Sequence, residues 1–409
     1  MPKALVLVRN PVTHDSRVLR EARLLREFGF DTLVVGVVSP EERQTELKLD
    51  DGTRIVRLLG PLQLARQIVR RANGSEADGT IQRRSAAPRK ATRAAGLRRF
   101  IVACAFNVQG VALAWRVSPD LVHANDYDTM WIGIAAKLLR GSRLVYDAHE
   151  LWPDQNRDSG WRPWLIACEW LFVHVADARL TVSPGCAEEI ARRYRVTAPV
   201  VVRNVPERVL DGAEPRTDEP PVAVYVGILA PARGIEQAVR ALPAVPGLRL
   251  QLIGPDAEGF SAEIVRAAEH ASVADRVEVF PPVPPSEVPD AIARAQIGLV
   301  LIQPTSLSYR LSLPNKLFEY AAAGVPVLAS DLPVIGPLVR EAGIGEVVAP
   351  DDVDGIAAAM HRLVDAREDA TLRQRVRAFA LRTTWAQERH VLESVYASLP
   401  PRRRESAAS

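Results

Sequence analysis

The sequence predicts an α/β protein built from two domains, each with a parallel sheet covered by helices. With 409 residues, the chain exceeds what one hydrophobic core usually organises, so two domains of roughly 200 residues are expected. Short apolar runs alternate with helical patterns along most of the chain, which is typical of βαβ units. Residues 206–221 are polar, contain four prolines, and separate two such series, so they predict a linker.

The first series predicts an N-terminal domain over residues 1–205. An amphipathic helix is expected at residues 16–28, closed by Gly29, and another helix at residues 97–117. Apolar runs predict its strands at residues 3–8, 32–38, 54–59, 121–124, 144–147, 180–183 and 200–203.

The second series predicts a domain over residues 222–384. Its strands are expected at residues 222–226, 248–253, 277–280, 297–302, 327–329 and 346–348. A last helix at residues 385–399 and a disordered tail at residues 400–409 follow. Ligands of doubly wound sheets bind outside the carboxyl ends of the strands, so a cleft lined by both sheets is expected.

Composition argues against several classes of protein. The most apolar tract, residues 100–115, has 16 residues and includes Asn107 and Gln109, whereas a membrane span needs about 20 apolar residues. It is interpreted as a core helix. The chain begins directly with a strand pattern and without a signal pattern, which predicts a cytoplasmic protein. The spacing of the three cysteines, Cys104, Cys168 and Cys186, is not typical of disulfides or of a zinc site. They are expected to be small, buried apolar residues.

Residues 308–331 carry the most informative pattern. They predict a polar turn, a short helix at residues 315–323 with Asn315 as N-cap, a Gly-Val-Pro break and a buried strand. Glu319 is then expected near the positive end of the helix, where free N–H groups can face a phosphate. An acid that merely complements the helix dipole is the alternative.

The run Leu-Pro-Asn-Lys-Leu-Phe-Glu-Tyr followed by Ala-Gly-Val-Pro-Val resembles the donor-site segment of family 4 glycosyltransferases, which are retaining enzymes with the GT-B fold. The resemblance implies two doubly wound Rossmann-like domains facing a central cleft, with the last helix crossing back to the N-terminal domain. It also implies that Glu319 binds the ribose and that Leu313, Asn315 and Lys316 line the donor site. The first of the family's two glutamates falls on Leu311.

The turn Gly227-Ile-Leu-Ala-Pro-Ala-Arg233-Gly234 follows a predicted strand and opens a predicted helix. It resembles the family's phosphate turn, with Gly227 and Gly234 at its ends. Arg233 takes the place of one of the family's two cations, and Ile228 takes the place of the other. A guanidinium can bind two phosphate oxygens at once, so Arg233 is expected to act on the leaving diphosphate. A solvated loop arginine is the alternative.

Polar residues follow two strands of the N-terminal domain. His149 and Glu150 end one strand, and His123, Asp126 and Asp128 surround the end of another. The resemblance implies that the histidine of Tyr-Asp-Ala-His-Glu lies near the sugar and the acceptor. His149, Glu150 and Asp126 are therefore the catalytic candidates, and His123 and Asp126 the acceptor candidates. A structural His–Glu pair and an N-cap role for Asp128 are the alternatives.

The loop after the first strand supplies three further acceptor candidates, His14, Asp15 and Arg17. Many relatives have a glycine-rich loop there, and this chain has none. Four tryptophans crowd into residues 152–170, where they could stack on sugars or lie at a membrane interface. Two of them, Trp164 and Trp170, are predicted to be core residues of a helix at residues 163–175.

A basic loop is expected over about residues 60–99. Between Arg54 and Arg99 there are 12 lysines or arginines and two acids, so this segment carries +10. A solvated insertion is one interpretation. Nucleic acid is disfavoured because no aromatic residue is interleaved there. Binding to an anionic inner membrane surface, beside a lipid-linked envelope saccharide as acceptor, is the other interpretation.

These observations predict a retaining, metal-independent glycosyltransferase that takes a nucleotide diphosphate sugar and needs no cofactor. A nucleotide-sugar epimerase of the same fold, or a sugar-nucleotide binding protein with a decayed catalytic site, are the alternatives. A nicotinamide-dependent dehydrogenase is disfavoured, because no G-x-G-x-x-G follows either first strand.

Overall fold

The computed structural model describes residues 1–13, 15–39, 44–60, 93–155, 160–210, 220–257 and 259–400, and for residues 93–100 the backbone alone. Residues 61–92 of the predicted basic loop, residues 401–409 of the tail, His14 and most of the predicted linker lie outside these residues. Residues 93–99, which were expected in the loop, form the start of helix α3 (Arg93–Val117) instead. By its internal contacts the chain divides into two compact units. The first comprises Met1–His149, Ile166–Leu180 and Val395–Ser409, and the second comprises Glu150–Leu165 and Thr181–Ser394. The domain boundaries expected at residues 205 and 222 stay a prediction.

The first sheet has eight strands in the order β3-β4-β2-β1-β5-β6-β7-β8. β1 lies between β2 and β5 and is parallel to both, and the short β3 is antiparallel to β4 at the edge. The strands are β1 (Lys3–Leu7), β2 (Asp31–Val37), β3 (Glu46–Lys48), β4 (Arg54–Leu58), β5 (Leu121–Asn125), β6 (Arg143–Ala148), β7 (Ala178–Thr181) and β8 (Val200–Val201). The predicted parallel sheet is confirmed, and β3 is an addition to it.

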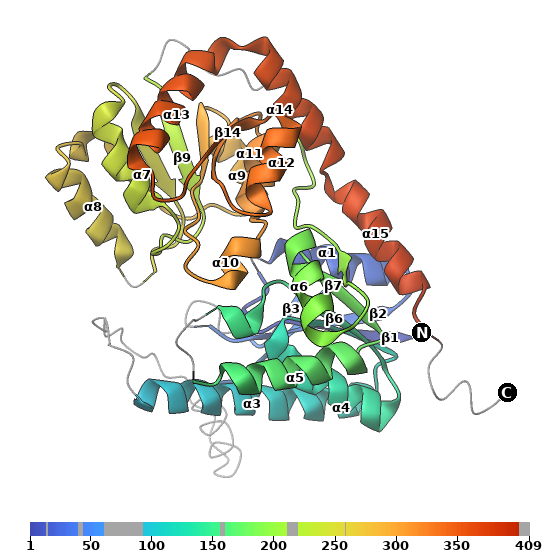
Figure 1. The fold of residues 1–409 in the computed structure, drawn as a ribbon. Helices are drawn as coiled ribbons and strands as arrows, with labels where there is room; N and C mark the ends of the chain where they lie inside the picture. Colours follow the sequence, from blue (N-terminus) through green and yellow to red (C-terminus); the bar gives the residue numbers. More distant parts are fainter. Residues whose placement is uncertain are drawn as a thin grey trace. The chain divides into compact units, whose positions relative to one another are not determined.

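Helices connect these strands, and three of them lie together along the sheet (Figure 1). These three are α3 (Arg93–Val117), α4 (Met130–Arg140) and α5 (Arg162–Val175). The others are α1 (Ser16–Glu27) and α6 (Pro184–Tyr194). α1 begins where Asp15 accepts the Val18 N–H at 3.2 Å, as an N-cap does.

The second sheet has six parallel strands in the order β11-β10-β9-β12-β13-β14. They are β9 (Val222–Val226), β10 (Arg249–Ile253), β11 (Val277–Phe280), β12 (Ile297–Val300), β13 (Val327–Ser330) and β14 (Gly345–Val348). Its helices are α7 (Ile235–Ala241), α8 (Phe260–His270), α9 (Val288–Ile292), α10 (Leu307–Leu311), α11 (Asn315–Ala322), α12 (Ile335–Ala342), α13 (Val353–Asp365) and α14 (Ala370–Arg382). Strands are added from β9 to β11, and one crossover then returns the chain to β12 on the other side of β9, which is the doubly wound arrangement.

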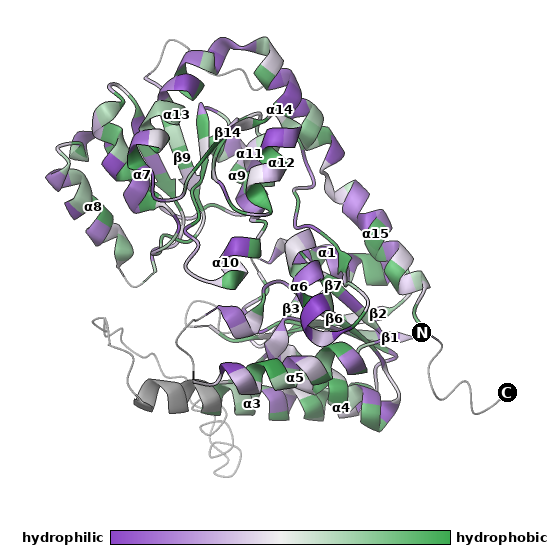
Figure 2. Ribbon diagram, viewed as in Figure 1, coloured by the Kyte–Doolittle hydropathy of each residue, from purple (hydrophilic) through white to green (hydrophobic). Residues whose placement is uncertain are grey.

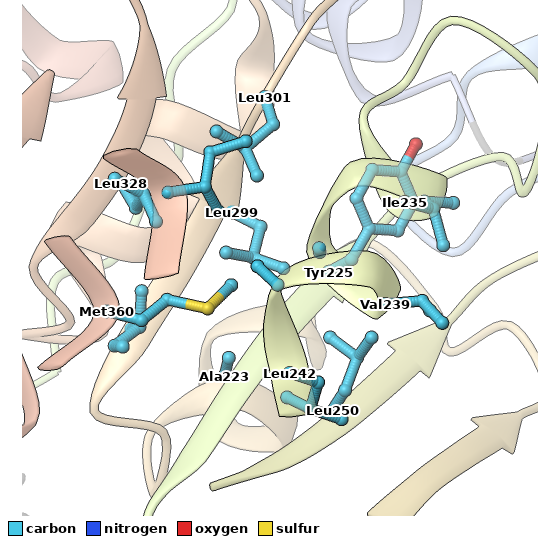
Figure 3. Close-up of a cluster of buried hydrophobic side chains, with 14 of the residues drawn as sticks. Ala223, Tyr225, Ile235, Val239, Leu242, Leu250, Leu299, Leu301, Leu328 and Met360 are labelled. Atoms are coloured by element: carbon cyan, nitrogen blue, oxygen red, sulfur yellow. The ribbon is translucent and has the colours of Figure 1, made fainter. Parts of the chain in front are cut away.

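Buried apolar side chains fill both faces of the second sheet. Figure 3 shows one cluster, in which Tyr225, Leu299 and Ile235 pack between strands and α7. On the other face Tyr320 of α11 is fully buried, and its hydroxyl accepts the Val226 N–H at 3.0 Å. The ring of Tyr320 occupies the space beside Gly298, where a Cβ would lie 2.3 Å from the Tyr320 Cγ. This contact fixes α11 on the sheet.

The last helix is α15 (Trp385–Ala397), and its final residues, from Val395 onward, belong to the first unit. Its Tyr396 is buried, with the hydroxyl 2.7 Å from His123 Nδ1 and the ring packed edge-on against Phe28. The predicted return of the last helix to the N-terminal part of the chain is therefore confirmed.

Four local predictions are wrong. Pro314, not Asn315, occupies the N-cap position of α11. Glu319 is the fifth of the eight residues of this helix, past its first turn, and does not lie near the positive end. Cys104 is exposed, unlike Cys168 and Cys186. Trp164 and Trp170 are more than half exposed. The two tryptophans were misassigned because helical spacing shows which residues share a face but not which face packs against the protein. None of the helices in the described part is long and apolar enough to cross a membrane.

Candidate active-site residues

The turn between β9 and α7 requires glycine at both ends. Gly227 has φ +126°, and its N–H donates to the Ile253 carbonyl at 2.9 Å. Gly234 has φ +79°, and a Cβ there would lie 2.0 Å from the Leu301 carbonyl oxygen. Only glycine tolerates both the positive φ and this approach. The two glycines of the predicted phosphate turn thus bring its backbone close to the ends of β10 and β12.

Arg233 lies half-buried in this turn. Its guanidinium carbon is 4.9 Å from the centroid of the Tyr309 ring, a distance at which a cation is attracted to the ring face. Its Nε is buried and has no hydrogen-bond partner among the described residues. The side chain is therefore oriented by a ring and retains an unused donor.

Lys316 lies on the other side of the same turn. It is 8% exposed, and its Nζ lies 3.4 Å from the centroid of the Tyr225 ring. A Cβ on Gly227 would be 3.3 Å from that Nζ, so the amine reaches the start of the turn. Burial holds the pKa of Lys316 well below its ordinary value, Arg233 lowers it further, and Glu319 opposes the shift. Burial therefore disfavours the charged form of the Lys316 amine, and an anionic ligand beside the amine would favour this form.

The remaining donor candidates lie on α11 and just before it. Glu319 is half-buried, Leu313 is buried, and Asn315 is exposed. Leu311, where the family has its other glutamate, ends α10, and its carbonyl accepts the Ser183 hydroxyl at 2.6 Å. The structure thus brings Gly227, Arg233, Lys316 and Glu319 together, and adds Tyr225 and Tyr309, whose roles no sequence motif indicated.

A second polar cluster lies at the carboxyl ends of β5 and β6 in the first unit. Arg17 is its centre. Its Nε and Nη2 donate to Asp147 Oδ2 at 2.9 and 2.6 Å, and its Nε lies 3.1 Å from Glu21 Oε1. All three side chains are almost completely buried. Burial opposes the charged carboxylate, but Arg17 and neighbouring histidines hold the pKa of Asp147 well below its usual range. Arg17 therefore keeps Asp147 ionised.

His123 completes this buried group. Its Nε2 lies 3.4 Å from Glu21 Oε2 and 3.5 Å from Asp147 Oδ2, and its Nδ1 faces the Tyr396 hydroxyl. Glu21, His123 and Asp147 are the one group of possible metal ligands among the described residues. Arg17 supplies one positive charge between the two carboxylates, and burial raises the pKa of Glu21, which favours its neutral form.

His149 is the member of the cluster that reaches the surface. Its Nε2 donates to Asn125 Oδ1 at 2.9 Å, and its Nδ1 lies 3.5 Å from Asp126 Oδ2. Asp126 has φ +62° and accepts the His149 N–H at 3.1 Å. Burial opposes the charged imidazole, but the carboxylates of Asp126 and Asp147 outweigh it and raise the pKa of His149 to about 10. His149 is therefore an imidazolium at neutral pH.

The other candidates of this unit have different surroundings. Arg17 and His123 are buried behind His149, so their expected contact with an acceptor stays a prediction that the geometry does not favour. Asp15 caps α1 and accepts the amide of Asn10 at 2.7 Å. Burial raises the pKa of Asp128 to about 6, although Arg9 at 3.0 Å opposes the rise.

Glu150 belongs to the second unit, is exposed, and accepts a hydrogen bond from Gln155 at 2.7 Å. Sequence reasoning missed Glu21, Asn125 and Asp147. Two features of the sequence could have indicated these residues: the i,i+4 spacing of Arg17 and Glu21, and the polar residues Asn125 and Asp147 near the ends of two adjacent strands.

Comparisons with known proteins identify the family. A model described as Glycosyltransferase Family 4 matches residues 16–204, and one described as Glycosyl transferases group 1 matches residues 220–366. The chain belongs to the group 1, family 4 glycosyltransferases. In sequence it is 26% identical to the glycogen synthase of Mycobacterium tuberculosis strain H37Rv over 296 residues, which cover 67% of this chain and 66% of that protein.

Solved structures share the fold over the whole chain. Sucrose-phosphate synthase from Thermosynechococcus elongatus has a TM-score of 0.74 at 18% identity, with 100% of each chain covered. Anabaena Alr3699/HepE, solved in complex with UDP and glucose, has a TM-score of 0.69 at 14% identity, with 98% of this chain and 100% of that chain covered. The predicted GT-B fold is thereby confirmed.

Proposed function

We propose that the protein transfers a glycosyl group from a nucleoside diphosphate sugar to an acceptor hydroxyl, with retention at the anomeric carbon. The observation that carries this proposal is the pair of cations, Arg233 and Lys316, at the strand end where Glu319 is also placed. A guanidinium and an amine that a phosphate would help to protonate suit a diphosphate, and a carboxylate suits ribose hydroxyls. The family relationship and the UDP complex of Alr3699/HepE support this choice of donor.

The chemistry follows from the charges. The acceptor oxygen bonds to the anomeric carbon, the bond from that carbon to the diphosphate oxygen breaks, and the acceptor proton passes to the leaving phosphate. Negative charge grows on the diphosphate as the bond breaks. Fixed cations beside it stabilise the transition state more than the ground state, and this difference lowers the barrier. The unused Nε donor of Arg233 and the amine of Lys316 are the groups for this role.

His149 is proposed to act from the first unit as a hydrogen-bond donor. Its imidazolium, held by Asp126 and Asn125, can donate to a sugar hydroxyl or a phosphate oxygen but cannot act as a general base while it is charged. Asp126 is then a positioning residue as well as a possible acceptor of a substrate hydroxyl. For the acceptor itself we propose a saccharide of the cell envelope, carried on a lipid.

The proposal is tested by incubating the purified chain with single nucleoside diphosphate sugars and with candidate acceptors. Release of nucleoside diphosphate that depends on an acceptor, with an α-linked product from an α-linked donor, is the expected result. Conversion of the donor to its epimer without an acceptor would instead identify an epimerase. Donor binding in a thermal-shift assay without turnover on any acceptor would indicate a binding protein, since saturation at 100 times the Kd adds about 2.7 kcal/mol.

A further inference from the structure

The outer face of α3 is apolar along its described length. Its exposed residues from position 101 onward are Ile101, Cys104, Val108, Ala112, Trp115 and Arg116. The first five recur at helical spacing and form one stripe. Val108 is 69% exposed and Trp115 is 50% exposed. A helix on the surface of a soluble domain normally presents polar residues to solvent, so an apolar stripe on the exposed side of α3 is unusual.

The neighbouring helices continue the same surface. On α4 the exposed residues are Trp131, Leu138 and Leu139, and Leu138 is 72% exposed. On α5, beyond position 165, they are Ala167, Trp170 and His174. Figure 2 shows the hydrophobic colouring along α3, α4 and α5. Three tryptophans and several aliphatic side chains are thus exposed on one layer of helices.

These helices are packed side by side, so their exposed residues share one surface. Gly110 of α3 lets Ile132 of α4 approach, because a Cβ on Gly110 would lie 2.2 Å from the Ile132 Cδ1. The guanidinium of Arg140 covers the Trp115 ring at 3.6 Å. Trp131 of α4 packs edge-on against Phe172 of α5, with ring centroids 5.0 Å apart. We refer to this surface as the α3–α4–α5 face.

The outer face of α8, in the second unit, has a different composition. Its exposed positions include Glu263, Arg266 and Glu269 beside Val265. Charged and apolar residues alternate there, as on an ordinary solvated helix. The apolar composition is therefore a property of the α3–α4–α5 face and not of the exposed helices in general.

The charged residues in the sequences of these three helices are mostly basic. The sequences of the three helices contain a single acid, Glu169, which is buried and accepts the Tyr146 hydroxyl at 2.9 Å. α3 itself contains four arginines, and one of them, Arg116, is exposed. A partner for this face must therefore accept apolar side chains and also be negatively charged.

We propose that the α3–α4–α5 face is a docking surface for an anionic lipid bilayer. Tryptophan prefers the boundary between headgroups and acyl chains, where its ring is buried and its N–H stays hydrated. Aliphatic side chains beside it enter the apolar layer, and an exposed arginine such as Arg116 attracts anionic headgroups. A second copy of the chain fits less well, because a two-fold interface would set the arginines of both copies against each other.

The test measures binding of the full chain to vesicles by flotation. Vesicles of equal parts phosphatidylcholine and phosphatidylglycerol are compared with vesicles of phosphatidylcholine alone. The wild-type chain is expected to bind the anionic vesicles more tightly, and brominated lipids are expected to quench its tryptophan fluorescence. The double variant Val108→Glu/Leu138→Glu should bind anionic vesicles at least about tenfold more weakly, because two charges would have to enter the interface.

Control variants separate membrane docking from misfolding and from self-association. Val265→Glu on α8 should bind vesicles as the wild type does. Thermal unfolding should be unchanged in both variants, since the substituted side chains are exposed. Trp170→Ser provides a second test of the face, because it should also weaken binding to anionic vesicles. Wild-type chain that fails to bind anionic vesicles overturns the proposal. So does an oligomer, seen by sedimentation velocity, that the double variant dissociates while vesicle binding stays unchanged. Turnover of a soluble acceptor is measured separately, so failure here leaves the proposed reaction untouched.

Discussion

The Nζ atom of Lys316 lies 3.4 Å above the Tyr225 ring, beneath a turn in which Arg233 rests on the ring of Tyr309. Two cations are thus held on aromatic rings at one strand end. A ring attracts a cation without neutralising it. Burial lowers the pKa of Lys316, so an anionic ligand would favour the charged form of its amine. The predictions below begin with this pair.

Lys316→Met is expected to stabilise the free protein and weaken nucleotide binding. Burial lowers the pKa of Lys316, so the wild type binds fewer protons when folded than when unfolded. Its stability therefore falls as the pH decreases below about 10.5, the unfolded value. Methionine removes this penalty, and the gain at pH 7 should be about 1 kcal/mol or more. Urea denaturation and calorimetry with nucleoside diphosphate measure both effects. Exposed Lys48→Met is the control, and a destabilised variant that binds normally would contradict the assignment.

Glu319→Ala should weaken the nucleotide sugar and the free nucleoside diphosphate equally, because both contain the ribose. Loss of hydrogen bonds to a charged group should cost about 1.5–3 kcal/mol of binding free energy. Calorimetry measures it, with Glu263→Ala on the exposed face of α8 as the matched control. Unchanged affinity in a folded variant would remove Glu319 from the donor site.

Arg233→Ala should lower kcat by on the order of 100- to 1000-fold, because one donor to the leaving group is lost. The effect should approach the upper end, since Ile228 occupies the place of the family's second cation in the turn. Steady-state kinetics with saturating donor provides the measurement. Arg266→Ala on α8 should leave kcat unchanged. A near-normal kcat in Arg233→Ala would exclude this role.

His149→Gln should flatten the pH dependence of stability between about pH 6.5 and 10. The carboxylates of Asp126 and Asp147 raise the pKa of His149 to about 10 against the effect of burial. A raised pKa gives stability that is complete below the unfolded value and is lost as the pH rises through the folded value. One group changes the unfolding free energy by at most about 1.4 kcal/mol per pH unit. The difference between wild type and variant isolates this contribution from that of Lys316, which has the opposite sign.

Tyr396→Phe should destabilise the protein by about 1–3 kcal/mol, because it leaves a buried nitrogen of His123 without its partner. Phenylalanine keeps the edge-on contact with Phe28, so the loss reports on the hydroxyl. Urea denaturation measures it. If stability were unchanged, the last turn of α15 would not be held through this hydrogen bond.

The sequence predicted the strands of both sheets well, because a buried parallel strand is a short apolar run between helical patterns. β3 was not predicted, because its sequence Glu-Leu-Lys contains only one apolar residue, which is half-buried, and so lacks an apolar run. Arg233, Lys316 and Glu319 were found through a motif. Tyr225 and Tyr309 were not, because their contacts join segments that are distant in sequence. Trp164 and Trp170 were misassigned since spacing does not reveal which side of a helix has a neighbour.

The fit of Tyr320 beside Gly298 restricts the routes by which this site can change over generations. A larger residue at position 298 is blocked while the ring is present. A smaller residue at position 320 leaves the Val226 N–H without its acceptor, and the ring's space empty. Either single change is therefore expected to destabilise the packing of α11 on the sheet. Because α11 also holds Lys316 and Glu319, a substitution at position 298 or 320 would displace two residues of the proposed nucleotide site.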